Sequence, residues 1–425
     1  MQGTHAPALR STMGATLPRI HSRLFMPVTP LTLISFLLHA WICWRIAPPL
    51  ADISLAGGLF LASLTASATL IPLALKFARS LPETLPMRMV DWAGLLSMGL
   101  FSTLMTFTLL RDALLVLALA GALLVGLASG SWLSLDGLIE WSAMAVPVTA
   151  LLVTIWGFAN ARRTASVIRV DVPSAGLPEA LYGFSVAQIS DLHVGTTIRQ
   201  EYVRRIVERV NGLRADMVAI TGDLVDGRVA DLRAHVAPLS ELVSTHGTFF
   251  VTGNHEYYSG AHSWVDELGR LGMHVLLNQH KVLHHDNTGE QLPGAVTLAR
   301  DTGMVVVAGV ADFHAHNFDA SHRSDPLAAL AGAPLGARLR LLLAHQPRSA
   351  TAAASAGFDL QLSGHTHGGQ FWPWMYFVRF QQPFTAGLHK LENLWVYTNR
   401  GTGYWGPPKR FGVASEITHL RLVPA

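Results

Sequence analysis

Five short motifs in the C-terminal half of the chain combine aspartate, asparagine and histidine in an order that suits a metal centre. They are Asp191-Leu192-His193, Gly222-Asp223, Gly253-Asn254-His255, His345 and Gly364-His365-Thr366-His367. Carboxylate and amide oxygens together with neutral imidazoles are donors that divalent cations bind, and a two-metal site usually shares one carboxylate between its ions. The residue types therefore indicate a hydrolytic centre that holds two metal ions.

Each motif directly follows an apolar stretch with the character of a β-strand. The stretches span 184–190, 217–221, 248–252, 341–344 and 358–363. Side chains two residues apart in extended backbone point to the same side, so Asp191 and His193 can reach one ion, and His365 and His367 form a similar pair. The glycines before Asp223, Asn254 and His365 allow sharp turns close to a ligand. The sequence thus predicts five strand ends that converge on one site.

Each residue also has an ordinary structural explanation. A single histidine among the 20 in this chain is usually a surface or a satisfied core residue. Asp223 could cap a helix after its strand, and Asn254 could be a turn residue after glycine. These explanations do not account for five turns that all carry ligand-type groups. Taken jointly, the motifs favour the metal centre.

The motif series D-x-H, G-D, G-N-H-E, H and G-H-x-H resembles the signature of the calcineurin-like metallophosphoesterases over residues 183–422. The forms DLHVG, TGDLVDG, GNHEYY, LLAHQP, LSGHTHGGQ and RGTGYWGPPKRFG resemble the bacterial membrane-associated branch with the YkuE and YaeI phosphodiesterases and lipid A precursor pyrophosphatases. The resemblance implies that Asp191, His193 and His367 bind one metal, that Asn254, His345 and His365 bind the other, that Asp223 bridges both, and that His255 faces the substrate.

A two-metal centre explains hydrolysis without a serine or cysteine nucleophile. Two ions about 3.5–4 Å apart lower the pKa of a bridging water and coordinate the phosphoryl oxygens for in-line attack by hydroxide. His255 would protonate the leaving oxygen or stabilise charge on the equatorial oxygens, a role worth roughly 10²–10⁴-fold in rate. The cofactors expected are two divalent ions, drawn from Mn, Fe, Zn, Co or Ni, which this donor set accepts.

Four neighbouring residues have open interpretations. Glu256 either orients His255 through the other ring nitrogen or is a solvated loop acid. Asp226 and Asp312 are interpreted as supporting or turn residues rather than direct ligands. Arg400, in a glycine-rich segment, could hold a phosphate, although a surface arginine is the simpler interpretation.

The region 24–160 is predicted to be a polytopic membrane region of four or five α-helices. Its apolar stretches span 24–44, 53–75, 92–110, 113–135 and 141–158. Each approaches the ~20 residues that a helix needs to cross about 30 Å of hydrocarbon, and none has the polar stripe of a soluble surface helix. Pro27, Pro30 and Pro147 shorten the first and last stretches, which leaves the count open.

The chain therefore divides into a basic arm at 1–23, the membrane region at 24–160, a linker leading into the next domain at 161–182, and a metallophosphoesterase domain at 183–425. Helix-like stretches at 200–213, 229–244, 263–271 and 349–356 alternate with the strands, which indicates sheets covered by helices. The resemblance makes the expected fold a four-layer α/β/β/α sandwich.

A multi-pass protein of the cell (inner) membrane is expected, with an orientation that depends on the number of spans. Basic residues in the arm and between residues 76 and 88 favour the cytoplasm for both segments. Five spans would then place the catalytic domain outside, which we slightly favour, whereas four spans would place it inside, next to Arg162 and Arg163.

The expected substrate is a phosphodiester, phosphomonoester or pyrophosphate. Residues 371–380, rich in large apolar side chains, form either a buried hairpin or an exposed lip near membrane lipids. A lip would suit a lipid-linked substrate such as UDP-diacylglucosamine. No nucleic-acid partner is expected, because net charge is only +3 and no dense basic run is present. The alternative is a membrane sensor or scaffold without turnover, which predicts a missing ligand or a missing His255.

Overall fold

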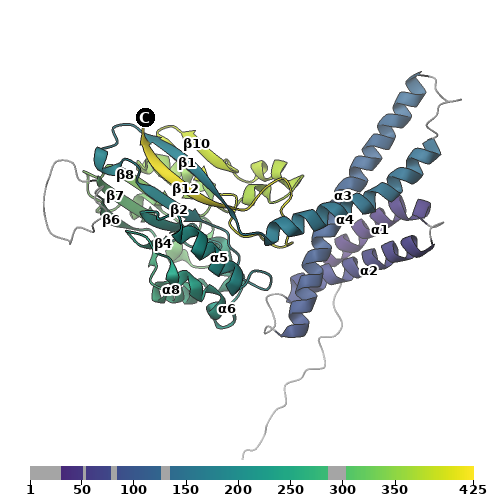
Figure 1. Cartoon of the computed structure of the whole chain (residues 1–425), viewed down its shortest axis with the longest axis horizontal. Coiled ribbons are helices and arrows are strands. Elements are labelled where there is room, and N and C mark those ends of the chain that lie inside the picture. Colours follow the sequence, from purple (N-terminus) through teal and green to yellow (C-terminus); the bar gives the residue numbers. More distant parts are fainter. Residues whose placement is uncertain (1–29, 51–53, 78–83, 126–134, 286–302) are drawn as a thin grey trace, which may run out of the picture.

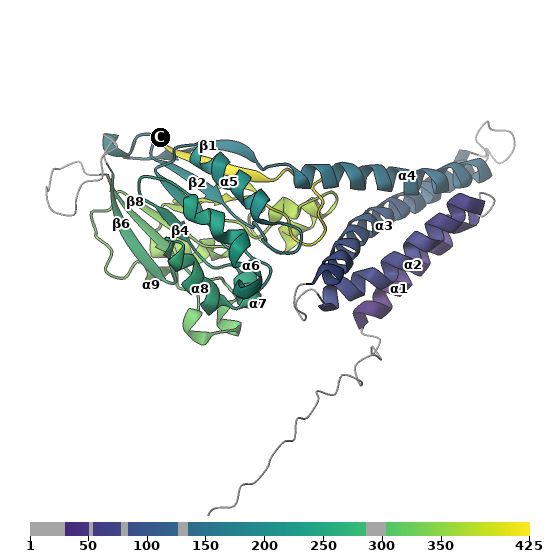
Figure 2. The ribbon, with the colours of Figure 1, turned by 60° about the horizontal axis from the view of Figure 1, so that its bottom comes forward.

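The computed structural model describes residues 30–50, 54–77, 84–125, 135–285 and 303–425. Figures 1 and 2 show two parts, a bundle of long helices and a mixed α/β domain, which meet where α3 and α4 approach the domain. The functional site lies in the α/β domain, and the helical bundle contacts the domain on one side of that site.

The helical bundle contains α1 (Pro30–Leu50), α2 (Ser54–Phe77), α3 (Leu85–Val125) and α4 (Leu135–Arg162). Within the described residues, these four helices are long and apolar enough to cross a membrane. The stretches 92–110 and 113–135 were expected to be separate helices, but α3 runs through the first and most of the second. The structure therefore has four apolar helices, the lower of the two expected counts.

The helix α3 continues because its central charges have partners inside the bundle. Arg45 donates to both carboxylate oxygens of Asp112, each at 2.8 Å. Arg111 donates to Ser142 Oγ at 2.9 Å and to the Ile139 carbonyl at 3.1 Å. Since paired charges do not need to reach water, the charged pair at 111 and 112 does not break the helix. At 41 residues, α3 is about 60 Å long, roughly twice the hydrocarbon thickness.

The α/β domain has two six-stranded sheets. The first has the order β1 (Ser166–Ser174), β12 (Glu416–Pro424), β2 (Ser185–Ile189), β3 (Met217–Ile220), β4 (Thr248–Phe250) and β5 (His274–Val275). The second has the order β10 (Gly387–Leu391), β11 (Leu394–Thr398), β9 (Leu360–Ser363), β8 (Leu339–Leu343), β7 (Gly303–Gly309) and β6 (Gln279–His285). The segment 161–182, expected as a linker, contributes β1, which pairs in parallel with β12.

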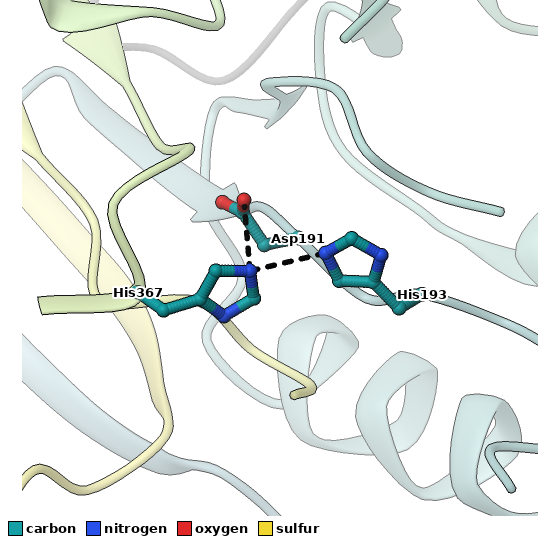
Figure 3. Close-up of side chains that lie close together, drawn as sticks. All are labelled: Asp191, His193 and His367. Atoms are coloured by element: carbon teal, nitrogen blue, oxygen red, sulfur yellow. Dashed lines mark hydrogen bonds and ion pairs between the residues drawn. The ribbon is translucent and has the colours of Figure 1, made fainter. Parts of the chain in front are cut away.

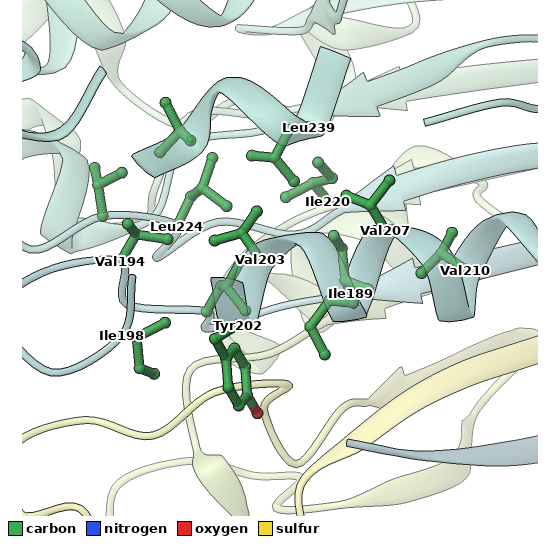
Figure 4. Close-up of a cluster of buried hydrophobic side chains, with 14 of the residues drawn as sticks. Ile189, Val194, Ile198, Tyr202, Val203, Val207, Val210, Ile220, Leu224 and Leu239 are labelled. Atoms are coloured by element: carbon green, nitrogen blue, oxygen red, sulfur yellow. The ribbon is translucent and has the colours of Figure 1, made fainter. Parts of the chain in front are cut away.

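Helices cover the outer faces of both sheets. They are α5 (Gln200–Asn211), α6 (Val229–Val236), α8 (Ala261–Arg270), α9 (Pro326–Ala329) and α10 (Ala350–Ala356). The short helix α7 (Asn254–Ser259) follows β4 and packs in a separate small cluster with Ala311 and Ala315. Figure 4 shows one such layer, in which Val203, Val207 and Val210 of α5 pack against Ile189 and Ile220 of the first sheet.

A second core fills the space between the two sheets, where Val186, Phe249, Val305 and Leu341 are buried. A third core lies between the second sheet and α10, around Ala353. The expected four-layer α/β/β/α sandwich is thereby confirmed.

The topology brings the five motifs to one edge of the sandwich. Strands β2, β3 and β4 are parallel neighbours in the first sheet, and β8 and β9 are parallel neighbours in the second. Because the carboxyl ends of parallel strands meet at one edge, ligand-type residues that follow these strands converge there.

Several contacts hold the bundle against the same edge of the domain. Trp374 Nε1 donates to Ser102 Oγ of α3 at 2.9 Å, and Thr196 Oγ1 donates to Asp91 Oδ2 at 3.2 Å. The ammonium group of buried Lys409 donates to the Gly99 carbonyl at 3.2 Å and also to Thr103 Oγ1. Burial lowers the pKa of Lys409 to about 8. The helix α3 is therefore attached to the domain close to the ligand motifs.

Candidate metal centre

The first group of donors consists of Asp191, which follows β2, with His193 and His367 (Figure 3). The Nε2 atoms of His193 and His367 lie 3.0 Å apart, and His367 Nε2 lies 3.4 Å from Asp191 Oδ1. One donor atom from each residue lies within 4.8 Å of the others. Three donors from two different sheets thus converge closely enough to surround one ion.

The second group consists of Asp223, His345 and His365, which follow β3, β8 and β9. His345 Nε2 lies 3.1 Å from Asp223 Oδ2 and 3.2 Å from His365 Nδ1. Asn254 lies at the start of α7, directly after the loop that follows β4. Its Oδ1 atom is buried and accepts no hydrogen bond within the described part of the chain. A buried polar oxygen normally accepts a hydrogen bond, so an oxygen without a donor suits a metal ligand, whose partner is the ion.

Asp223 lies between the two groups. Its Oδ2 atom is 3.9 Å from His193 Nε2 of the first group and 3.1 Å from His345 Nε2 of the second. Its Oδ1 atom accepts the backbone N–H of His255 at 2.8 Å, which fixes the carboxylate. This is the position that a shared carboxylate requires.

The backbone at the motifs is held in an uncommon conformation. Among the described residues, nine non-glycine residues have positive φ angles, and five of them are Asp191, His193, Asp223, His365 and His367. A left-handed conformation costs non-glycine residues about 1–3 kcal/mol and persists only where the surrounding structure enforces it. More than half of these strained positions are therefore predicted ligands.

Two glycines make room for the carboxylates. A Cβ atom on Gly253 would lie 2.2 Å from Asp223 Oδ1, and one on Gly364 would lie 2.2 Å from Asp191 Oδ2. No side chain can be accommodated at those distances without moving the carboxylate. The glycines in the motifs thus serve close packing around the donors as well as sharp turns.

Comparison with known proteins agrees with this geometry. A family model described as calcineurin-like phosphoesterase matches residues 184–369. A transmembrane protein with a metallophosphoesterase domain from Danio rerio is 34% identical over 343 residues, which cover 79% of this chain and 74% of that protein. The chain belongs to the calcineurin-like metallophosphoesterases.

Other relatives of this metallophosphoesterase occur in bacteria. An uncharacterized metallophosphoesterase of Campylobacter jejuni is 34% identical over 62% of this chain and 64% of its own length, slightly less than two thirds. The uncharacterized metallophosphoesterase YkuE of Bacillus subtilis is 26% identical over 59% of this chain and 83% of its own length. The expected resemblance to YkuE is confirmed, and the family extends beyond its bacterial branch into animals.

In three histidines of this metallophosphoesterase, a hydrogen bond fixes the Nδ1 atom of the ring. Asp226 accepts from Nδ1 of His193 at 3.2 Å and also from Nδ1 of His255. The Thr221 carbonyl accepts from Nδ1 of His345 at 2.7 Å. Such contacts fix the tautomer and leave Nε2 free for an ion or a substrate. Asp226 thus orients both His193 and His255, and the three residues also form a further group of donors close enough to hold an ion.

Glu256 has a role that neither sequence interpretation gave. Its carboxylate is buried and accepts backbone N–H groups of Gly253 at 2.6 Å, Asp223 at 3.0 Å and Leu224 at 2.7 Å. It thus joins the loops after β3 and β4, while Asp226 makes the orienting contact with His255. Burial and the charge of Asp223 raise the pKa of Glu256 to about 7.

The structure also shows the contacts of Asp312 and Arg400, whose roles the sequence left open. Asp312 is buried and accepts a hydrogen bond from Gln346 Nε2 at 2.9 Å, which makes it a supporting residue beside His345. Arg400 donates to Glu416 Oε2 at 2.7 Å, so its guanidinium is already paired with a carboxylate.

Sequence reasoning missed Arg410. It is buried and donates to the carbonyls of His367 at 3.1 Å and Arg400 at 2.8 Å, which holds the loop that carries His367. Burial lowers the pKa of Arg410 to about 10. In the sequence this arginine follows Lys409 and looks like one of a surface basic pair, so only its burial identifies it.

The charge states of the donors mostly suit metal binding. Burial lowers the pKa of His365 to about 3 and holds that of His367 well below its usual value, so both imidazoles are neutral. Burial opposes ionisation of Asp223, but His345 and other cationic neighbours outweigh it and hold the pKa of Asp223 well below its usual value. Neutral imidazoles and ionised carboxylates are the forms that bind metals.

The pKa values of two donors, Asp191 and His345, are shifted away from the forms that bind metals. Burial raises the pKa of Asp191. For His345 burial acts to lower the pKa, but Asp223 outweighs it and raises the pKa well above its usual value. A cation favours the ionised carboxylate and displaces the imidazole proton. The donor set, the free Asn254 oxygen and the converging Nε2 atoms together fit divalent transition-metal ions.

Proposed function

We propose that this metallophosphoesterase is a membrane-anchored phosphohydrolase that cleaves phosphodiester, phosphomonoester or pyrophosphate bonds with two divalent ions. The observation that supports it is the pair of neighbouring donor groups, with the Asp223 carboxylate 3.9 Å from His193 of the first group and 3.1 Å from His345 of the second, beside a buried, unpartnered amide oxygen. The proposed ligands are Asp191, His193 and His367 for one ion, Asn254, His345 and His365 for the other, and Asp223 for both. The ions, when bound, supply a hydroxide nucleophile and polarise the phosphoryl group.

His255 is the proposed catalytic acid of this phosphohydrolase. Its Nδ1–H is held by Asp226, and its Nε2 lies 3.9 Å from Asp223 Oδ2, on the side of the donors. From there Nε2 can give a proton to the leaving oxygen or donate a hydrogen bond to a phosphoryl oxygen. Asp226 positions this histidine and the ligand His193 together.

A lipid-linked phosphate ester, such as UDP-diacylglucosamine, is the proposed natural substrate. The support is the segment 371–380, which we call the lip. Its side chains Trp374, Phe377 and Phe380 are 40%, 52% and 79% exposed, and Trp372 packs against Phe107 of α3 with ring centroids 6.0 Å apart. An exposed aromatic surface beside a candidate membrane helix suits membrane lipids rather than a water-soluble substrate.

Removing the metal is expected to abolish hydrolysis. The full chain in lipid nanodiscs, stripped with a chelator, should lose roughly 10³-fold or more of its activity on bis-p-nitrophenyl phosphate and regain it with Mn, Fe, Zn, Co or Ni. Elemental analysis should find two ions per chain. A chain that binds metal but hydrolyses no diester, monoester or pyrophosphate would instead support the sensor or scaffold alternative.

We further propose that the catalytic domain faces the cytoplasm. With four helices, the first turns of α3 and the end of α4 lie at the domain side, where Asp91 contacts Thr196 and Asn160 contacts Arg410. The sequence leading into α3 and the end of α4 carry Lys76, Arg79, Arg88, Arg162 and Arg163. The connections 51–53 and 126–134 carry one charge between them, which is acidic. The excess of basic residues marks the cytoplasmic side. This proposal replaces the orientation expected from five spans.

Cysteine labelling tests this orientation. In a Cys43→Ser background, Ser129→Cys in the connection 126–134 should react with a membrane-impermeant maleimide in intact cells. Ser263→Cys on the exposed face of α8 should react only after permeabilisation. The opposite pattern would place the catalytic domain outside.

A further inference from the structure

A cavity of about 890 Å³ connects the candidate metal centre with α3. Its volume lies near the upper end of the usual range for ligand sites, about 300–1,000 Å³. At one end it is lined by His193, Asp226, His365 and His367, which belong to the metal centre. The cavity is therefore continuous with the place where a phosphate would react.

The wall opposite the metal centre belongs to the membrane helices. Leu95, Met98, Phe101 and Met105 of α3 line it, together with Ala74 of α2. Positions 95, 98, 102 and 105 follow the three- and four-residue spacing of one helix face, and Ser102 also lines the cavity. One face of α3 thus closes the active-site cavity with mostly thioether and hydrocarbon groups, next to the carboxylate of Asp91 and the hydroxyl of Ser102.

The lip supplies the remaining apolar wall. Phe371, Trp374 and Phe377 line the cavity, and Phe377 is also 52% exposed, so the cavity reaches the surface there. Trp374 is hydrogen-bonded to Ser102 of α3, which fixes the lip against the helix. The polar lining comes from loops beside the donors, including Thr196, Gln370 and Gln382, and from Asp91 and Ser102 of α3.

We propose that this cavity binds the hydrocarbon chain of a membrane lipid phosphate while its phosphate lies at the metal centre. The inference rests on the proposed function and assigns α3 to the substrate site. A chain in this position would replace water along Leu95, Met98 and Phe377 and gain the free energy of apolar burial. Because α2 and α3 are candidate membrane spans, the chain can move from the bilayer into the cavity without crossing water.

A chain-length series tests the proposal. The probes are p-nitrophenyl alkyl phosphodiesters with methyl, butyl and octyl chains, which share one leaving group. For the full metal-loaded chain in nanodiscs, kcat/KM should rise by up to about fourfold per added methylene until the cavity is filled. The double variant Leu95→Gln/Met98→Gln should lower the octyl-to-methyl ratio of kcat/KM at least tenfold.

Leu96→Gln is the matched control, because Leu96 neighbours Leu95 on α3 but is 38% exposed and does not line the cavity. It should leave the octyl-to-methyl ratio unchanged, which removes simple partitioning of long chains into the nanodisc as the cause. If the octyl-to-methyl ratio of kcat/KM were the same in the double variant as in Leu96→Gln, the cavity assignment would be overturned. Continued methyl-ester hydrolysis in the wild type would then leave the proposed function standing.

A binding measurement keeps the cavity assignment separate from turnover and from the folding of the double variant. An alkyl phosphonate with a diazirine near the end of its chain is not hydrolysed, and its labelling of the wild type can be mapped by mass spectrometry. Labelling of residues 91–105 or 371–378 would support the assignment. Labelling confined to the outer faces of α1 or α4 would overturn it, whatever the hydrolysis assays show.

Discussion

Asp223→Asn should lower kcat for phosphate-ester hydrolysis by about three orders of magnitude, corresponding to roughly 4 kcal/mol of transition-state stabilisation. The amide keeps the shape of the side chain and can still accept the backbone N–H of His255, which lies 2.8 Å from Oδ1. It loses the charge that lies between His193 and His345. The bound metal should therefore fall below two ions per chain.

Elemental analysis and steady-state kinetics measured on the same preparation check this prediction. Asp266→Asn is the matched control, because Asp266 is exposed on α8 and lies outside the donor groups. It should change neither metal content nor kcat. Full activity with two ions in Asp223→Asn would exclude Asp223 as the bridging ligand.

His255→Ala should reduce kcat by roughly 10²–10⁴-fold when the leaving group is an alkoxide, since such a group needs a proton as its bond breaks. With p-nitrophenolate as leaving group, which departs without protonation, the loss should stay below about tenfold. Metal content should not change, because His255 is not among the proposed ligands: its Nδ1 contacts Asp226, and its backbone N–H, which alanine keeps, donates to Asp223 Oδ1.

The measurement is the ratio of kcat values for an alkyl and an aryl ester in each protein. Exposed His389, changed to alanine, serves as the control and should leave this ratio at its wild-type value. Equal losses for both esters would show that His255 stabilises charge on the phosphoryl oxygens instead of donating a proton. Loss of metal in His255→Ala would show that His255 is a metal ligand.

The arrangement of the donors is largely readable from the sequence. Strand periodicity alone pairs Asp191 with His193, and the ends of parallel strands are expected to meet at one edge. The addition of His367 to this pair came from the family resemblance and not from a local rule. The strands β2, β3 and β4 begin within a residue of the apolar stretches expected for them. Helix α6 ends at Val236, earlier than the expected 244, where a 3₁₀ turn containing Pro238 follows.

The contacts that hold the metal ligands in place could not be predicted from sequence patterns. Asp226 and Glu256 are both acids three residues or fewer from a motif, yet one orients two histidines and the other accepts from four backbone N–H groups. Which role each takes depends on the direction of its side chain in the folded loops. Arg410 is a similar case, because a buried arginine and a surface arginine look alike in a sequence.

The sequence by itself determined the chemistry of this protein: the donor types, their order, their position after strands and the presence of an apolar N-terminal region. These follow from residue chemistry and from short-range periodicity. Only the tertiary structure decided that α3 is one continuous helix, since Arg111 and Asp112 find partners on α1 and α4. Only the tertiary structure placed Leu95 and Met98 in the same cavity as His365, because residues so distant along the chain meet through packing alone.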